Sequence, residues 1–201
     1  MKKKLFFVIV FILVAANIYS ADNQIIFNGS GDDIISIVKE EEDLPYLLFI
    51  NGNEEERHFA VKSYDENGNY LDLLVNTTEK YIGTVPIDLP VGTNTKMLEI
   101  TATGKWGVIV IPISLAHHID IGVEGSYTGD TVLWVNGEAK IAEIEGNIES
   151  RHFSVIAYDE YGNYSKLLVN TCDVYSGKVL LPKNTLLLKV SAKGNWSINL
   201  K

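Results

Sequence analysis

Residues 57–76, RHFAVKSYDENGNYLDLLVN, recur almost unchanged as residues 151–170, RHFSVIAYDEYGNYSKLLVN. Fourteen of the twenty positions are identical, at a constant offset of 94 residues. A period of about 90 residues is too long for a solenoid repeat and suits a small independent domain. The sequence therefore predicts two tandem copies of one domain.

The similarity extends beyond this stretch in both directions. Three further pairs of segments match: Asn28-Gly29-Ser30 with Glu124-Gly125-Ser126, Ile50-Asn51-Gly52-Asn53 with Ile144-Glu145-Gly146-Asn147, and Gly104-Lys105-Trp106 with Gly194-Asn195-Trp196. We place the first copy at residues 21–115 and the second at residues 116–201, joined by a short, stiff linker.

Each copy consists of short runs rich in Val, Ile, Tyr and Phe, separated by turn residues. This pattern is typical of an antiparallel β-sandwich, and no stretch after the N-terminal segment has the apolar period of a helix. In the first copy the expected strands are residues 24–27, 34–38, 46–50, 58–64, 70–75, 81–88, 96–102 and 106–111. The predicted fold is all-β, with two tandem antiparallel, jelly-roll-like β-sandwich domains.

Alternation along each strand predicts which side chains face the core. The inward positions of the first copy are Phe59, Val61, Ser63, Leu73, Val75, Leu98, Ile100, Trp106, Val108 and Val110. Their counterparts in the second copy are Phe153, Val155, Ala157, Leu167, Val169, Leu188, Val190, Trp196, Ile198 and Leu200. The last strand of the first copy is also apolar on its outer face, at Ile109 and Ile111. A strand apolar on both faces is covered on both faces, so we expect it to pack against the second copy.

The N-terminus has the pattern of a secretory signal peptide. Three lysines (residues 2–4) precede an apolar run over residues 5–16, and small residues follow at Ser20 and Ala21. The run is shorter than the roughly 20 residues of a membrane-spanning helix. We predict a signal peptide over residues 1–20, cleavage after Ser20, and a soluble exported protein without a transmembrane segment, either periplasmic or extracellular at the cell surface.

Charge and cysteine content narrow the possible partners. Loss of the signal peptide changes the net charge from −9 to −12, and an acidic chain without a basic stripe repels nucleic acid. Cys172 is the only cysteine, so no internal disulfide can form. Because the matching position in the first copy is Thr78, we expect Cys172 to be a small buried residue.

The candidate binding residues recur in matched pairs on the outward faces. Exposed tyrosines stack on sugars in many binding modules, although tyrosine is also a common strand residue. Histidine can serve a pH-sensitive site or bind a metal, or it can be a solvated strand residue. The binding candidates are Tyr64, Tyr158, His58, His152, Tyr70 and Tyr164.

No metal or cofactor is expected. Asp65-Glu66-Asn67-Gly68-Asn69 resembles a calcium loop only superficially, because its glycine is fourth instead of sixth. Hairpin geometry explains this segment fully. His117 and His118 lie at the junction of the copies, and as neighbours on an extended chain they point in opposite directions.

The motifs FAVKSYDENGNYLDLLVN and FSVIAYDEYGNYSKLLVN, with G-K-W and G-N-W near the ends of the copies, resemble a tandem domain of secreted bacterial proteins of unknown function. The fold is also loosely similar to carbohydrate-binding modules. Sequence motifs of hydrolases and phosphate-binding enzymes are missing from the chain. We expect a non-catalytic binding or adhesion module for the cell envelope, a glycan or another surface protein. The alternatives are a purely structural protein without a small ligand and, third, a hydrolase.

Overall fold

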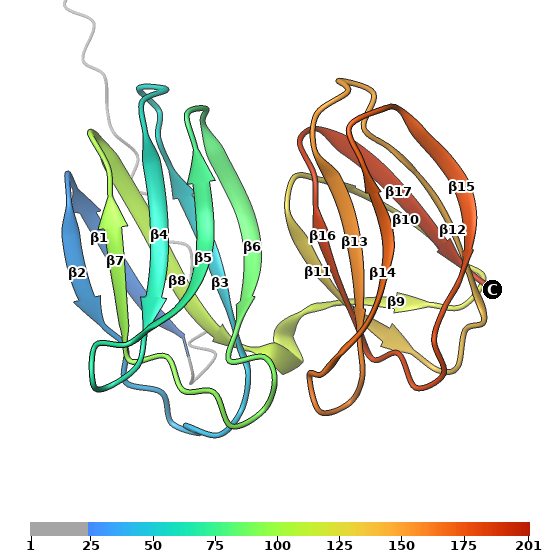
Figure 1. The fold of residues 1–201 in the computed structure, drawn as a ribbon, viewed down its shortest axis with the longest axis horizontal. Coiled ribbons are helices and arrows are strands. Elements are labelled where there is room, and N and C mark those ends of the chain that lie inside the picture. The colour runs from blue at the N-terminus through green and yellow to red at the C-terminus, as the bar shows by residue number, and fades with distance from the viewer. Residues whose placement is uncertain (1–23) are drawn as a thin grey trace, which may run out of the picture.

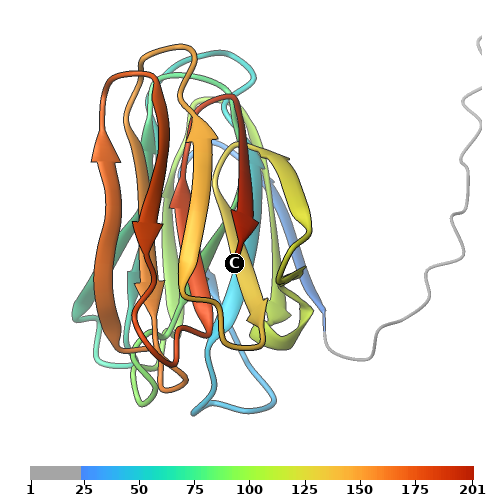
Figure 2. The ribbon, with the colours of Figure 1, turned by 90° about the vertical axis from the view of Figure 1, so that its right-hand side faces the viewer.

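The computed structural model describes residues 24–201, and the predicted signal peptide lies outside the described residues. These residues form two halves that lie side by side, each built from two β-sheets (Figure 1). In the view of Figure 2 the halves lie one behind the other, with their strands running up and down. Within residues 24–201 no helix is long and apolar enough to cross a membrane.

The first half contains two four-stranded antiparallel sheets. Sheet I has the order β1-β8-β3-β6, and sheet II has the order β2-β7-β4-β5. Their bounds are β1 (Ile25–Ser30), β2 (Asp33–Ser36), β3 (Tyr46–Gly52), β4 (Phe59–Tyr64), β5 (Tyr70–Thr77), β6 (Tyr81–Ile87), β7 (Met97–Thr101) and β8 (Lys105–Pro112). Each of the eight predicted ranges overlaps one of these strands, so the all-β prediction is confirmed.

The second half repeats this arrangement with one addition. Sheet IV has the order β10-β17-β12-β15, and sheet III has the order β14-β13-β16-β11-β9. Their bounds are β9 (His117–Asp120), β10 (Glu124–Thr128), β11 (Thr131–Asn136), β12 (Ile141–Gly146), β13 (Phe153–Tyr158), β14 (Tyr164–Thr171), β15 (Tyr175–Leu180), β16 (Leu187–Ser191) and β17 (Asn195–Leu200). Strand β9 runs parallel to β11 and has no counterpart in sheet II.

A single 3-10 turn, η1 (Ile113–Leu115), connects the halves. The predicted boundary between residues 115 and 116 lies at the end of this turn. That each half folds on its own stays a prediction.

Each half has its own apolar core between its two sheets. Phe59 and Phe153 are both fully buried at equivalent positions. The predicted inward residues of β4, β7 and β8, and of β13, β16 and β17, are likewise buried. These face assignments are therefore confirmed.

The assignment of Leu73 and Leu167 to the core is wrong. Both are exposed, and the neighbouring Leu74 and Leu168 are buried instead. The register of β4 with β5 shifts between Val61 and Lys62, so that one residue of β5 is skipped. A β-bulge of this kind reverses the alternation of faces, and simple periodicity cannot detect it.

The two tryptophans at equivalent positions fasten the first turn of each sandwich. Trp106 Nε1 donates to the carbonyl oxygen of Gly31 at 2.9 Å, and Trp196 Nε1 donates to that of Gly129 at 3.0 Å. Gly29 pairs with Trp106, and Tyr127 pairs with Trp196. Asn28-Gly29-Ser30 of β1 therefore corresponds to Ser126-Tyr127-Thr128 of β10, and not to Glu124-Gly125-Ser126 as the sequence alignment predicts. The sequence match was displaced by two residues because a glycine recurs in both segments.

Cys172 is exposed, which contradicts the expected burial. It lies in the turn after β14, where the chain leaves the sheet edge and alternation no longer determines the direction of side chains.

The outer faces of sheet I and sheet III pack against each other. Leu47, Ala116, Val132 and Leu187 are buried in this contact, with Ile111 beside them. The last strand of the first half therefore does pack on the second half, but through Ile111. Ile109 instead lies opposite Ile26 and Phe49 on the outer face of sheet I, outside this cluster. Strand β8 diverges from the second half as it runs away from η1 (Figure 1). For this reason sheet III covers only the C-terminal end of β8.

We predict that Leu187→Ala lowers the free energy of unfolding by about 2–4 kcal/mol, because it opens a cavity in the contact between the halves. Urea unfolding followed by tryptophan fluorescence measures the change. The matched variant Leu180→Ala removes an exposed leucine and should stay within about 0.5 kcal/mol of wild type. Equal effects of the two variants would contradict a packed interface.

Candidate functional site

The six predicted binding residues lie in different surroundings and do not form one surface. Tyr64 on β4 is half-buried, and its hydroxyl donates to Glu99 Oε2 at 2.5 Å. The Tyr70 ring meets it edge-on, with ring centroids 6.0 Å apart. This hydrogen bond to the Glu99 carboxylate raises the pKa of Tyr64 and lowers that of Glu99. Tyr64 and Tyr70 therefore form a fastened aromatic pair on the outer face of sheet II.

The second copy lacks this arrangement. Tyr158 packs against the contact between the halves, and burial raises its pKa. Tyr164 is exposed, and its hydroxyl oxygen accepts a hydrogen bond from the Leu167 amide at 2.9 Å. The tyrosines match in sequence, but only those of the first copy meet each other on an open face.

The histidines occupy equivalent exposed positions. His58 Nε2 lies 3.2 Å from Asn76 Oδ1, and His152 Nε2 lies 3.2 Å from Asn170 Oδ1. Among residues 24–201 no three His, Cys, Asp or Glu side chains are grouped closely enough to hold a metal ion.

The predicted hairpin at Asp65 is confirmed. Asp65 Oδ1 accepts from the backbone amides of Asn67 and Asn69, and Asp65 Oδ2 accepts from the Asn69 side chain. The Asn69 side chain, followed by the backbone amides, lowers the pKa of Asp65. Asp159 makes the same bonds in the second copy. The carboxylates of both turns are thus used to hold the chain.

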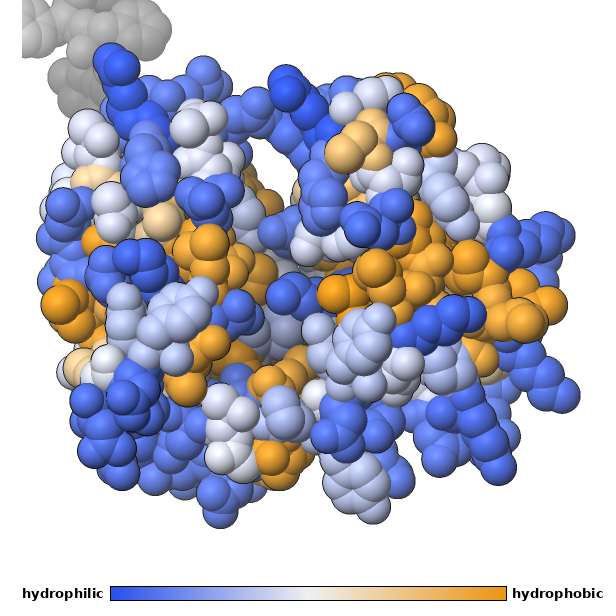
Figure 3. All heavy atoms as spheres, viewed as in Figure 1, coloured by the Kyte–Doolittle hydropathy of each residue, from blue (hydrophilic) through white to orange (hydrophobic). Residues whose placement is uncertain are grey.

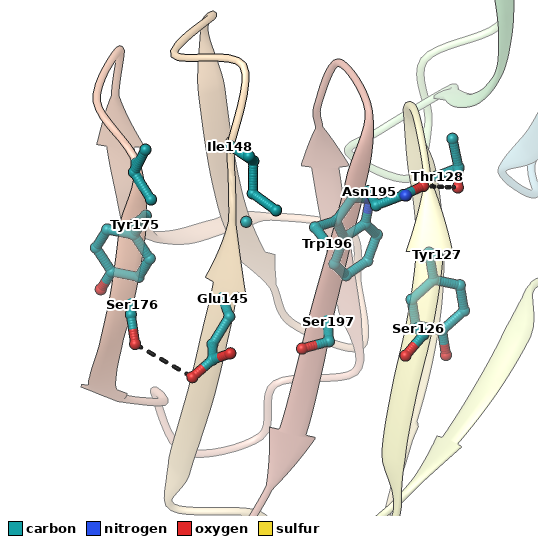
Figure 4. A pocket seen from close by; sticks show the side chains of 12 residues that line it. Ser126, Tyr127, Thr128, Glu145, Ile148, Tyr175, Ser176, Asn195, Trp196 and Ser197 are labelled. Atoms are coloured by element: carbon teal, nitrogen blue, oxygen red, sulfur yellow. Dashed lines mark hydrogen bonds between the residues drawn. The ribbon is translucent and has the colours of Figure 1, made fainter.

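A groove of about 540 Å³ lies on the outer face of sheet IV, the side of the molecule turned toward the viewer in Figure 2. Four strands supply polar side chains to it, and Figure 4 shows four of these side chains in a row across the sheet, with Thr128 and Asn195 above them. The polar side chains are Ser126, Thr128, Glu145, Ser176, Asn195 and Ser197. The row follows from β alternation, because Tyr127, Tyr175 and Trp196 on the same strands pack toward the core.

Hydrogen bonds within the groove fix the direction of its polar groups. Thr128 Oγ1 donates to Asn195 Oδ1 at 2.6 Å, and Ser176 Oγ donates to Glu145 Oε1 at 3.2 Å. Since the Asn195 oxygen is taken by Thr128, its amide nitrogen is the group that can donate to a bound molecule.

Two exposed aliphatic side chains, Ile148 (77% exposed) and Val174 (61% exposed), form the rim of the groove. They lie on two loops that Asn147 joins. The buried Asn147 has φ 61° and donates through Nδ2 to the carbonyls of Arg151 at 2.5 Å and Asp173 at 2.8 Å. Because these partners are in the two rim loops, the asparagine sets the spacing of the rim.

In the first copy a buried asparagine makes the same two hydrogen bonds to neighbouring loops, a clamp shared by both copies, but the side chains of the rim differ. Asn53, with φ 62°, donates through Nδ2 to the carbonyls of Arg57 at 2.6 Å and Glu79 at 2.9 Å. Next to these residues Glu54 and Lys80 form an ion pair at 2.6 Å, where the second copy has the two aliphatic side chains. The equivalent groove, of about 280 Å³, is lined by Asn28, Asn51, Glu54 and Lys105. The repeat alignment identified both asparagines, but not the groove beside them.

Two large hollows, besides a small one of about 140 Å³, lie between the halves. The upper one, of about 490 Å³, is visible between the halves in Figure 3 and is lined by Lys80, Arg151, His152 and Lys193 together with Glu79 and Asp130. Glu79 pairs there with Arg151 and Lys193. The lower one, of about 350 Å³, is lined mainly by apolar side chains, among them Leu44, Leu89, Val91, Ile113, Trp134 and Leu186.

Asp130 joins the two halves at the upper hollow. Its Oδ2 accepts from the Tyr81 hydroxyl at 2.8 Å, and its Oδ1 accepts from the Ala192 amide at 2.9 Å. The Thr84 amide donates to the Asp130 carbonyl at 2.8 Å. Burial raises the pKa of Asp130, although its hydrogen bonds, Lys189 and His152 oppose this, and burial also raises the pKa of Tyr81.

Comparison with known proteins gives no family. No family model and no curated protein matches the chain. Similar solved structures include the PBSX exported protein XepA (8% identity, 87% of this chain and 84% of that chain, TM-score 0.30). Another is a putative alpha-L-fucosidase from Bacteroides ovatus (8% identity, 90% of this chain and 38% of that chain, TM-score 0.28). A third is the regulatory subunit of a cAMP-independent protein kinase A from Trypanosoma cruzi (10% identity, 88% of this chain and 72% of that chain, TM-score 0.26). Likeness at these scores carries no functional argument.

We predict that Asp130→Asn changes the pH dependence of stability. A carboxyl whose pKa is raised on folding binds its proton more tightly in the folded state than in the unfolded state. Its contribution to the free energy of unfolding therefore decreases as the pH rises above 3.8, the ordinary pKa of an aspartate carboxyl. The free energy of unfolding of wild type, relative to Asp130→Asn, should therefore fall as pH rises from about 4 to 7.

Urea unfolding at a series of pH values measures this difference. Tyr81→Phe keeps the carboxylate but removes one donor to it, so its pH dependence should be steeper than that of wild type. A difference that is constant with pH, or that increases with pH, contradicts the assignment.

Proposed function

We propose that this is a non-catalytic binding protein that holds a glycan in the groove of sheet IV. The observation that carries the proposal is the row of hydroxyl, amide and carboxylate groups on a four-stranded sheet, below an aliphatic rim whose two loops Asn147 joins. The predicted signal peptide over residues 1–20 would deliver the protein to the periplasm or the cell surface, where glycans are abundant.

The chemistry of the groove suits a sugar. Sugar hydroxyls both donate and accept hydrogen bonds, and the groove offers groups of both kinds from Ser126, Glu145, Asn195 and Ser197. The C–H faces of a sugar ring are apolar and can lie against the rim residues. The groove's volume of about 540 Å³ is within the roughly 300–1,000 Å³ of small-molecule sites.

The lining favours binding over hydrolysis. Glycoside hydrolysis typically requires two carboxyl groups on either side of the scissile bond. Glu145 is the one carboxylate in the groove's lining, and its Oε1 is engaged by Ser176. The equivalent groove of the first copy holds Lys105 and the ion-paired Glu54, so its chemistry has diverged.

A glycan array probed with the chain from Ala21 onward identifies a ligand, and titration calorimetry measures its affinity. We expect the double variant Glu145→Ala, Asn195→Ala to bind about tenfold to hundredfold more weakly, because two hydrogen-bonding side chains are lost. Both positions are on the surface of the sheet, so the fold should be retained.

The matched control is Asn28→Ala, Asn51→Ala, which alters the groove of the first copy and should bind as wild type does. Tyr64→Ala tests the aromatic pair on sheet II separately. Failure to retain any glycan, or equal loss in the two double variants, would overturn the proposal and favour a purely structural protein.

A further inference from the structure

The contact between the halves joins two faces that are not equivalent. The two cores and this contact stack the sheets in the order II, I, III, IV. By the duplication, sheet I corresponds to sheet IV, and sheet II corresponds to sheet III. The outer faces of sheets II and IV are therefore the counterparts of the two faces that pack on each other within the chain. A head-to-tail contact of this kind can be repeated between copies of a chain.

The apolar residues of the contact have apolar counterparts on these two outer faces. The strand pairings align Val132 with Ile34 and Pro86 with Leu180. Val132 and Pro86 are buried, whereas Ile34 is 67% exposed and Leu180 is 68% exposed. Two further buried residues with half-buried counterparts are Leu187, aligned with Met97, and Leu47, aligned with Ile141. Burial of such aliphatic side chains favours association.

The tyrosine that bonds across the contact has a counterpart in a similar position. Tyr175 on sheet IV corresponds to Tyr81. A Cβ atom added to Gly83 would lie 2.7 Å from the Tyr81 hydroxyl, and one added to Gly177 would lie 2.7 Å from the Tyr175 hydroxyl. Both rings therefore lie over a glycine of their own strand. The Tyr175 hydroxyl is placed like the hydroxyl that donates to Asp130.

The aspartate of this bond is repeated as well. Asp32 is exposed, and its Oδ1 accepts from the Ala102 amide at 2.9 Å. Asp130 Oδ1 accepts from the equivalent Ala192 amide at 2.9 Å. The two carboxylates thus have the same anchor, and Asp32 Oδ2 corresponds to the atom that accepts from Tyr81.

An ion pair of the contact is the third repeated interaction. Glu79 pairs with Arg151 at 3.5 Å between the halves. Their counterparts, Asp173 and Arg57, are exposed and carry the same charges. Asp173 precedes a strand of sheet IV, and Arg57 precedes a strand of sheet II. In the same arrangement this pair forms only between two chains.

Other positions are more polar on the outer faces, so the repeated contact is weaker. Ser36 stands in place of Trp134, and Lys201 stands in place of Ile111. The contact within the chain is also favoured by the covalent connection through η1, which a contact between two chains lacks. We therefore expect association only at high protein concentration.

We propose that this protein associates with a second copy of itself, head to tail, with sheet IV of one chain on sheet II of the next. The contact repeats the one between sheets I and III. Asp173 pairs with Arg57 of the next chain, and the Tyr175 hydroxyl donates to Asp32 of the next chain. This association does not depend on glycan binding.

Sedimentation velocity of the chain from Ala21 onward, at about 10 µM to 1 mM, measures the association. The average mass should rise with concentration. Ile34→Glu on sheet II and Leu180→Glu on sheet IV should each weaken association about tenfold or more, because a charge would enter an apolar contact. The matched control is Val123→Glu, which changes another exposed aliphatic residue. Its counterpart Ile25 lies outside the contact between the halves, so this variant should associate as wild type does.

A mixture of the two blocked variants tests the head-to-tail arrangement. Ile34→Glu keeps an unchanged sheet IV, and Leu180→Glu keeps an unchanged sheet II. The mixture should therefore form dimers with about the wild-type affinity and nothing larger. A contact between two identical faces would instead let one of the variants associate by itself, and this result would overturn the proposal.

An exchange of charges tests the predicted ion pair. Arg57→Glu should weaken association several-fold, and Arg57→Glu combined with Asp173→Arg should restore it. Thermal melting checks that each variant folds, as expected from changes of exposed side chains. A monomeric wild type at ~1 mM, unchanged association of both blocked variants, or no restoration by the exchange would contradict the repeated contact.

The glycan site can be tested separately from this association. The counterparts of Glu145 and Asn195 are Asn51 and Lys105, which line the open groove of the first copy. The variant Glu145→Ala, Asn195→Ala should therefore associate as wild type does. Loss of glycan binding with normal association would count against the glycan site only.

Discussion

Both halves of the protein depend on the face-to-face burial of two sheets, with Phe59 and Phe153 at equivalent central positions. The chain has a single cysteine and can form no internal disulfide, so burial must stabilise the fold. This requirement explains why the two copies agree best at strand and turn residues. Burial of apolar surface is non-directional, however, and specific polar bonds determine how the loops leave the cores.

The buried asparagines Asn53 and Asn147 are the clearest of these bonds. Each has a positive φ and ties two loops together through one amide group. The clamp is the same in both copies, yet the adjoining side chains are an ion pair in one and two aliphatic residues in the other. A shared framework with exchangeable rims allows one fold to present two different surfaces.

The contact between the halves makes the copies unequal in a second way. It covers the outer face of sheet III and leaves that of sheet II exposed, so Tyr158 is packed whereas its counterpart Tyr64 is not. Asp130 bonds across the contact to Tyr81, whereas Asp32 at the equivalent position bonds the Ala102 amide of its own half. The connecting segment also supplies β9 to the second copy. Identical motifs therefore lie in different environments.

The sequence by itself determined the all-β class, the duplication, the eight strands of the first copy and most of the inward positions, because alternation and repeated turn residues are local properties. It also identified both clamping asparagines as repeated residues. The tertiary structure alone decided the bulge that buries Leu74 in place of Leu73, the covering of Tyr158 and the groove of sheet IV. These features depend on which strands become neighbours and which faces meet, and such contacts between distant residues leave no periodic pattern in the chain.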